Sequence, residues 1–139
     1  MSAADKIQQA IDEFLKAGFD QEEEDMFTDV AVLNSNDPEP KKIAAGKIRI
    51  LKNKKTGRTR LLMRDHPAQQ VLLNHYIMPG MDIEDDADFL RWSATDYATN
   101  PKGEDKHIVI SFPPVRMDSG SKFVQEFKKA KERNASLLK

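Results

Sequence analysis

The feature that most constrains the fold is a period-two pattern in the basic stretch GKIRILKNKKTGRTRLLMR, residues 46–64. Successive side chains of a β-strand point to opposite faces, so Lys47–Lys52 and Arg58–Arg64 are predicted to be two strands. The intervening NKKTG contains Gly57, which can adopt the left-handed conformation that closes a hairpin. The pattern therefore predicts a hairpin with an apolar face and a basic face. The basic face is expected to carry Lys47, Arg49, Arg58, Arg60 and Arg64.

Such a basic face has two interpretations. Like charges that lie opposite each other in a sheet are destabilising, so a bound anion would relieve the repulsion. Alternatively, the bases form a solvated outer face of a half-buried sheet. The hairpin alone does not decide between a binding site and a solvated surface.

The other segments predict a helix, several strands and a second helix. Residues 5–17 have apolar residues at helical spacing, with Gly18 as a stop signal, and residues 19–27 form an acidic run that is expected to be extended. The strand-like segments are Thr28–Leu33, Val71–Ile77, Phe89–Asp96 and His107–Phe112, with Ile83–Asp88 as an acidic loop or the approach to a strand. Asp118 or Ser119 is expected to cap a final helix with an apolar stripe of Phe123, Val124, Phe127 and Ala130. This order predicts an α+β, mainly β, roll or barrel in one domain.

Composition argues against several functional classes. The 139 residues contain no cysteine and no apolar run near the roughly 20 residues of a membrane span, so we expect an intracellular protein without stable membrane insertion. No phosphate-binding glycine motif occurs, and the three histidines lack metal-ligand spacing. We therefore expect neither an enzyme nor a protein with a cofactor, a metal ion or catalytic residues.

Charge is strongly segregated along the chain. Residues 1–38 carry a net charge of −8, residues 39–64 of +9, residues 65–105 of −7 and residues 106–139 of +5. The isoelectric point is near 6.3, whereas nucleic-acid-binding domains usually lie above about 9. Alternating blocks of charge favour a protein partner with both acidic and basic surfaces.

The basic hairpin and the strand after it resemble the Ran-binding domain of the Ran-binding protein 1 family. RLLMR (residues 60–64) and NHYI (residues 74–77) match the family in order and spacing, and Trp92 with Asp96 and Tyr97 resembles its W-x-A-x-D-[FY] segment. The acidic EEEDMF before the first strand and KFVQEFKKA in the last helix are also similar. The resemblance covers roughly residues 22–133.

This resemblance implies a pleckstrin-homology-like fold, a seven-stranded antiparallel barrel or sandwich capped by the C-terminal helix. It implies binding of the GTP-bound form of the small GTPase Ran, sequestration of Ran's acidic C-terminal tail, assistance to the GTPase-activating protein and disassembly of nuclear export complexes. The acidic arm would contact a basic patch on Ran through Glu22, Glu23, Glu24 and Asp25. The basic sheet would receive the tail through Arg49, Arg58, Arg60 and Arg64, with Asn74 and Trp92 nearby. Arg60→Glu is then expected to weaken Ran binding in a domain that remains folded.

The resemblance divides the chain into an N-terminal helix and acidic arm (1–26), a Ran-binding domain (27–133) and a tail (134–139). It implies a monomer in the cytoplasm, able to shuttle or to lie near nuclear pores, and the start at Met1 favours a stand-alone protein. Ternary complexes with the GTPase-activating protein and an export receptor are expected partners. Residues 7–15 could form an export signal, although a docking helix is the simpler interpretation. The family's W-K-x-R-G motif is missing, since Pro40, Lys41, Ile43 and Ala44 stand in its place, which leaves the affinity open.

Other functions fit the basic hairpin as well. The same face of a pleckstrin-homology-like module could bind anionic lipid headgroups or another acidic protein segment. An RNA-binding domain fits less well, because no aromatic residue interleaves the basic strands to stack on bases.

Overall fold

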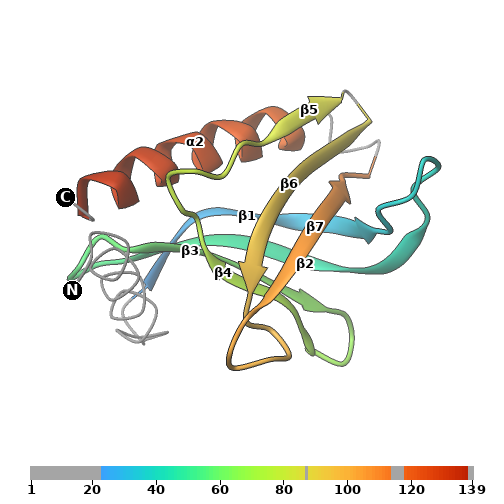
Figure 1. Ribbon diagram of the computed structural model, residues 1–139, viewed down its shortest axis with the longest axis horizontal. Helices are drawn as coiled ribbons and strands as arrows, with labels where there is room; N and C mark the ends of the chain where they lie inside the picture. The colour runs from blue at the N-terminus through green and yellow to red at the C-terminus, as the bar shows by residue number, and fades with distance from the viewer. Residues whose placement is uncertain (1–22, 87, 114–117, 138–139) are drawn as a thin grey trace, which may run out of the picture.

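The structure, a computed structural model, describes residues 23–86, 88–113 and 118–137. Within these residues seven β-strands precede one long helix (Figure 1). Their bounds are β1 Glu23–Asn34, β2 Lys42–Asn53, β3 Thr59–Asp65, β4 Val71–Tyr76, β5 Glu84–Asp86, β6 Phe89–Asp96, β7 Glu104–Ser111 and α2 Ser119–Leu137. The helix predicted at residues 5–17 and the export-signal segment lie outside the described residues.

The strands form one antiparallel sheet in the order β4-β3-β2-β1-β7-β6-β5. The sheet curls until β4 meets the end of β6, where the Asn74 amide donates to the Asp96 carboxylate (2.7 Å) and the Tyr97 amide donates to the Asn74 carbonyl (2.9 Å). In Figure 1 the strands β1 to β4 cross β6 and β7 at a steep angle, and α2 runs along one side of the sheet. The predicted α+β roll, with its closing C-terminal helix, is confirmed.

The period-two pattern sorts the hairpin residues as predicted. Ile48 and Ile50 of β2, and Leu61 and Met63 of β3, are fully buried on the inner face. They join the rings of Phe27, Trp92, Phe123 and Phe127 in one core cluster. The turn between the strands has the conformation that its sequence predicts, because Gly57 has a φ of +79°. The Asn53 side chain accepts hydrogen bonds from the amides of Lys55 and Thr56 in the same turn. Hydrophobic burial thus fixes which side of the hairpin is left for the bases.

Helix α2 is longer than the sequence predicts. Its apolar stripe of Phe123, Phe127 and Ala130 is buried as expected, and the Ser119 hydroxyl at its first turn donates to the Asp29 carboxylate of β1. Residues 134–139 are predicted to be a tail, but the helix continues to Leu137. The reason is Asn134, which is completely buried and hydrogen-bonds the sheet.

Strand β1 also differs from the prediction. It begins at Glu23 rather than at Thr28, so Glu23, Glu24 and Asp25 belong to the sheet. Glu23, Glu24 and Asp25 pair with Asn53, Lys52 and Leu51 of β2, and a register shift follows Asp25. Carboxylates are poor strand formers in general, but here β2 and β3 supply cations for them. These three acidic residues are therefore part of the folded sheet.

Candidate functional site

The outer surface of β1, β2 and β3 carries the basic residues that the sequence singles out. We call it the basic face and define it by Lys47, Arg49, Arg60 and Arg64. In the observed register Lys47 lies opposite Arg64, Arg49 opposite Leu62, and Arg60 opposite Leu51. Lys47 and Arg64 therefore form one like-charged pair across the two strands. Arg49 and Arg60 each lie opposite a leucine and not opposite another cation.

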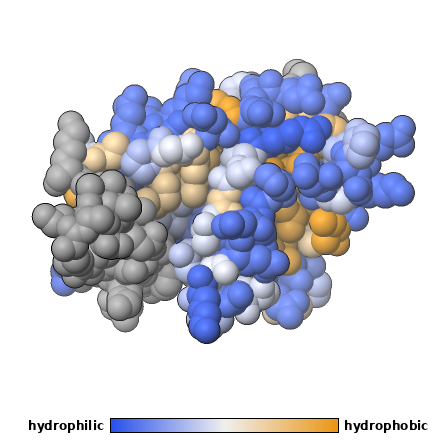
Figure 2. All heavy atoms as spheres, in the orientation of Figure 1, coloured by the Kyte–Doolittle hydropathy of each residue, from blue (hydrophilic) through white to orange (hydrophobic). Residues whose placement is uncertain are grey.

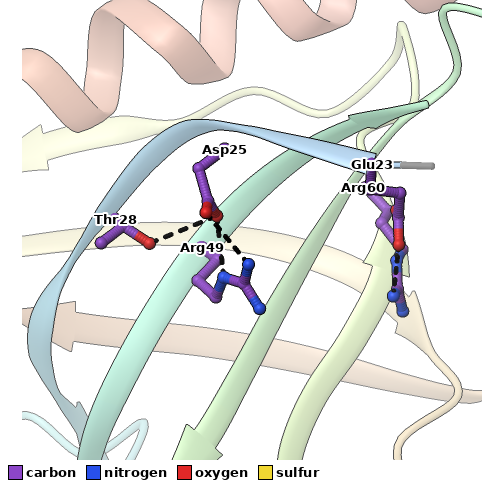
Figure 3. A network of polar contacts seen from close by, with 5 residues as sticks. All are labelled: Glu23, Asp25, Thr28, Arg49 and Arg60. Atoms are coloured by element: carbon purple, nitrogen blue, oxygen red, sulfur yellow. Dashed lines mark hydrogen bonds and ion pairs between the residues drawn. The ribbon is translucent and has the colours of Figure 1, made fainter. Parts of the chain in front are cut away.

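Arg49 forms a two-point ion pair with Asp25 of β1 (Figure 3). Its Nε and Nη2 atoms donate to the two carboxylate oxygens at 2.7 and 3.0 Å, and the Thr28 hydroxyl lies 3.4 Å from the same carboxylate. Hydrogen bonding to Arg49 lowers the pKa of Asp25, and the same bond raises the pKa of Arg49. The two side chains remain 36% and 45% exposed, so water screens the pair.

Arg60 forms a second two-point pair, with Glu23, and this one is buried. Nε and Nη2 donate to the Glu23 carboxylate at 2.8 Å each, and Nη1 donates to the Asn74 side chain at 2.9 Å. The arginine and glutamate side chains are only 10% and 12% exposed. Three donors of the guanidinium thus have acceptors on two other strands, so Arg60 acts as a cross-link of β1, β3 and β4.

Glu24, which lies between Glu23 and Asp25 in the sequence, points to the opposite side of β1. Glu24 lies opposite Lys52 in the ladder and pairs with its ammonium group at 3.2 Å. All three described members of the predicted acidic arm, Glu23, Glu24 and Asp25, therefore face bases of this same chain. The fourth, Glu22, lies outside the described residues.

Lys47 and Arg64 differ from the other bases. Neither forms an ion pair with a carboxylate among the described residues, and Arg64 donates only to the Gln69 backbone carbonyl, at 3.1 Å. Beside them lies a hollow of about 320 Å³ that Arg49 and Asp25 also line. A second hollow of about 360 Å³ shares Lys47 and Gln69 with it and is lined elsewhere mostly by apolar or small residues: Val30, Ala45 and Gly46.

The two hollows together form a groove whose one end is cationic and whose other end is apolar. Val30 is among the few large apolar residues that are exposed on the described part of the chain. Hydrophilic side chains cover most of the face of the molecule seen in Figure 2, with apolar residues limited to small areas between them. The groove is suited to an extended segment that carries carboxylates.

The remaining predicted site residues lie at the margin of the basic face or behind it. Arg58 precedes β3 in the turn; its charge and that of Arg60 partly offset the effect of burial, which raises the pKa of Tyr76. Asn74 is held by Arg60 and by Asp96. Trp92 is 3% exposed on the inner face, with ring centroids 5.6 Å from Phe123 and 5.4 Å from Phe127. The structure therefore places Trp92 in the core beneath the sheet.

Trp92 is tied to a buried histidine. Its indole N–H donates to His75 Nε2 at 3.2 Å, so His75 carries its proton on Nδ1 and donates it to the Tyr76 carbonyl at 2.9 Å. Burial lowers the pKa of His75, and the nearby Lys106 adds to this effect, while the Tyr76 hydrogen bond and the charge of Asp96 oppose it. The neutral ring is the form that fits both contacts.

This lowered pKa predicts that acid weakens the fold before the carboxylates titrate. The unfolded chain takes up the proton near pH 6.5, while folded His75 takes it up only at a lower pH, so the free energy of unfolding falls as the pH drops below about 6.5. We expect a loss of about 1 kcal/mol between pH 7.5 and 5.5, from a limiting slope of about 1.4 kcal/mol per pH unit. Urea unfolding followed by Trp92 fluorescence at both pH values measures it.

The exposed His66 provides the control. His66→Gln should retain the pH dependence, whereas His75→Gln should flatten it whatever its own cost in stability. Equal free energies of unfolding at pH 7.5 and 5.5 in the wild-type protein would contradict the assignment.

Sequence reasoning missed some residues of the groove. Lys47 is on the predicted basic face but is absent from the candidate contacts, although the hairpin register already places it opposite Arg64. Gln69, with a φ of +62°, comes from a segment without a signal in the sequence. Val30 lies in the predicted strand Thr28–Leu33, but nothing local marks it as part of a groove. No cluster of His, Cys, Asp or Glu that could hold a metal ion occurs in the part of the chain that the structure describes. In the part of the chain that the structure describes, no helix has the length and apolar character needed to cross a membrane.

Comparisons with known proteins agree with this architecture. The sequence model of the family described as "RanBP1 domain" matches residues 15–133. The protein "E3 SUMO-protein ligase RanBP2" of Homo sapiens is 36% identical over 101 residues, which cover 68% of this chain and 3% of that protein. "Ran-binding protein 1 homolog a" of Arabidopsis thaliana is 30% identical over 95 residues, covering 66% of this chain and 40% of that protein. The chain thus spans less than half the length of these curated relatives.

A solved structure supports the fold. The Ran binding domain from the nuclear complex component Nup2 of Ashbya gossypii has a TM-score of 0.65 to this chain and covers 81% of this chain and 98% of its own. At 21% identity this likeness shows the fold, and it confirms the predicted pleckstrin-homology-like arrangement. Because the family match extends over most of the sequence and both hairpin and closing helix are in place, the chain belongs to the RanBP1 domain family of Ran-binding domains.

Proposed function

We propose that this chain binds the GTP-bound form of Ran and holds Ran's acidic C-terminal tail on the basic face. Membership in a family of binding modules supports Ran as the partner. The observation that supports the site is the cross-strand pair of Lys47 and Arg64. They lie opposite each other beside a hollow, and neither forms an ion pair with a carboxylate among the described residues. An acidic segment in this groove would remove a repulsion and gain charge-assisted hydrogen bonds.

Holding the tail would keep it away from the GTPase core. In that way the chain would assist the GTPase-activating protein and help to dismantle export complexes, as a binding module without chemistry of its own. It would act in ternary complexes with the activating protein or an export receptor, from the cytoplasm or near nuclear pores. The printed names of its relatives, a Ran-binding protein 1 homolog and a Ran binding domain of a nuclear complex component, favour this setting.

The missing W-K-x-R-G motif alters the surface next to the groove. Ile43, which stands where the family has arginine, is 64% exposed on β2. An exposed apolar side chain replaces a cation there, so part of the contact with Ran would differ from that of the family. The proposal therefore assigns the main electrostatic contact to Lys47, Arg49 and Arg64.

Titration calorimetry with Ran tests the proposal. Ran loaded with a GTP analogue should bind with a salt-dependent affinity, and Ran·GDP should bind at least about tenfold more weakly, as the proposed preference for the GTP-bound form requires. Equal affinity for the GTP-analogue and GDP forms of Ran, or binding to neither form, would contradict the proposal. Flotation with anionic vesicles distinguishes the lipid-binding alternative, which predicts recruitment to vesicles without Ran.

A further inference from the structure

The basic face is already partly occupied by the chain itself. The acidic residues that the family resemblance assigns to a contact with Ran are paired with bases of β2 and β3: Glu23 with Arg60, Glu24 with Lys52 and Asp25 with Arg49. In Figure 3 the Glu23 and Asp25 carboxylates lie over the sheet and point at the two guanidinium groups. A carboxylate held in such a two-point pair has fewer free acceptor sites and less uncompensated charge to offer a partner's basic patch.

The two pairs on the outer surface are not equivalent. Glu23 and Arg60 are nearly buried, and Arg60 has a further acceptor in Asn74. Separating this pair would therefore leave a buried charge without a counter-ion. Asp25 and Arg49 are both more than one-third exposed. Pairs of this kind contribute little net free energy and exchange with competing ions.

The position of Asp25 in β1 also favours exchange. The β1–β2 register shifts between Asp25 and Phe27, so one extra residue, Met26, interrupts the ladder next to Asp25. Such irregularities leave a residue unpaired and re-aim the neighbouring side chains. The Asp25 side chain also lines the same 320 Å³ hollow as Lys47 and Arg64. It therefore lies between the occupied and the open part of the basic face.

We propose that Asp25 is an internal competitor that occupies the two-point binding edge of Arg49 until an acidic segment of the partner displaces it. This inference rests on the proposed function, because the displacing segment is the acidic tail assigned to the groove. Lys47 and Arg64 are the bases that the tail meets first. Arg49 becomes available when Asp25 leaves, while Glu23 and Arg60 stay paired as a structural cross-link.

The exchange has a consequence for the acidic run. A tail that takes over Arg49 frees the Asp25 carboxylate, which can then contact a basic surface of the same partner. Binding of the tail and exposure of this carboxylate are thus coupled, and each favours the other. The protein alone keeps both charges neutralised, which limits binding of unrelated anions or cations to either one.

The test uses an oligo-aspartate peptide as the probe and compares the wild-type chain with Asp25→Asn. Removing the competitor should tighten peptide binding about two- to fivefold, the factor that corresponds to an exposed ion pair. Asp37→Asn is the matched control, because it removes the same charge from an exposed loop away from the basic face and should leave the affinity within about twofold. Asp25→Asn binding no tighter than wild type, or no more than Asp37→Asn, overturns the inference, as does the lack of peptide binding by both.

A second readout follows the carboxylate directly. The Asp25 carboxyl carbon, observed by NMR, should titrate at a higher pH in the peptide complex than in the free protein, because the bond to Arg49 that lowers its pKa is lost. An unchanged or lower midpoint in the complex overturns the inference. The proposed function fails on a different measurement, the affinity for Ran·GTP, so a peptide result in favour of exchange and a negative Ran titration are distinguishable.

Discussion

Replacing Arg60 with glutamate is expected to lower the free energy of unfolding by about 3–5 kcal/mol. The substitution removes a cation that gives two hydrogen bonds to Glu23 and one to Asn74, and it places a second carboxylate against Glu23 in a site where both side chains are nearly buried. The Glu23 charge then has no counter-ion, and the tie between β1, β3 and β4 is broken. Urea or thermal unfolding measures the loss.

Arg64→Glu is the matched control, because it makes the same change four residues away on the same strand and the same face. Arg64 is exposed and lies opposite Lys47, so this variant should stay within about 0.5 kcal/mol of wild type or gain slightly. The charge-swapped variant Glu23→Arg with Arg60→Glu should recover part of the stability. If Arg60→Glu were as stable as Arg64→Glu, the buried pair would have no structural role.

This expectation replaces the one that the sequence suggests. From the alternation alone Arg60 is one of several surface bases, and its reversal should affect only binding. The structure separates the bases by burial: Arg60 supports the fold, Arg49 is paired but exposed, and Lys47 and Arg64 are open. Binding experiments on the basic face are therefore best designed on Lys47, Arg49 and Arg64.

Asn134→Ala is expected to cost about 2–4 kcal/mol, because it leaves buried backbone groups of the sheet without partners. The Asn134 side chain accepts from the Thr59 amide (2.9 Å) and donates to the carbonyls of Thr59 (2.7 Å) and Ile77 (2.8 Å). One side chain thus fastens the last turns of α2 to β3 and to the end of β4. The Thr59 carbonyl keeps the hydrogen bond that the Ile77 amide donates (3.3 Å), so the main desolvation penalty falls on the Thr59 amide and the Ile77 carbonyl.

The control for this variant is Ser136→Ala, an exposed position two residues further along the same helix. It should change the free energy of unfolding by no more than about 0.5 kcal/mol. Amide hydrogen exchange at Thr59 should accelerate in Asn134→Ala and not in Ser136→Ala. Comparable stability of the two variants would show that the helix end is not anchored through Asn134.

Local patterns were sufficient for much of the fold. Phe89–Asp96 is predicted with the bounds that β6 has in the structure, and apolar and polar residues alternate from Leu90 to Thr95. The sorting of Ile48, Ile50, Leu61 and Met63 to the core follows from the same periodicity. The apolar stripe of α2 was likewise visible, since its phenylalanines recur at helical spacing.

What the sequence did not reveal depends on contacts between distant residues. Asn134 is a polar residue in a charged segment, and nothing local indicates that it reaches Thr59, 75 residues away. The acidic run is predicted to be extended, and the family resemblance assigns it to an arm that contacts Ran; only the three-dimensional contacts show that Asp25 and Glu23 pair with Arg49 and Arg60. The residue types of the site were thus predictable from the sequence. The pairing of its arginines with acidic residues of the same chain was not.

Titration of Ran·GTP against the wild-type chain and the double variant Lys47→Glu with Arg64→Glu tests the central claim most directly. The double variant should bind at least about tenfold more weakly while it remains as stable as wild type, because both open bases of the groove are reversed. The control, Lys122→Glu with Lys128→Glu, makes the same change in net charge at exposed positions of α2 and should bind nearly as well as wild type. If both double variants bound Ran·GTP as tightly as the wild-type chain does, the basic face would be only a solvated surface and the account would be wrong.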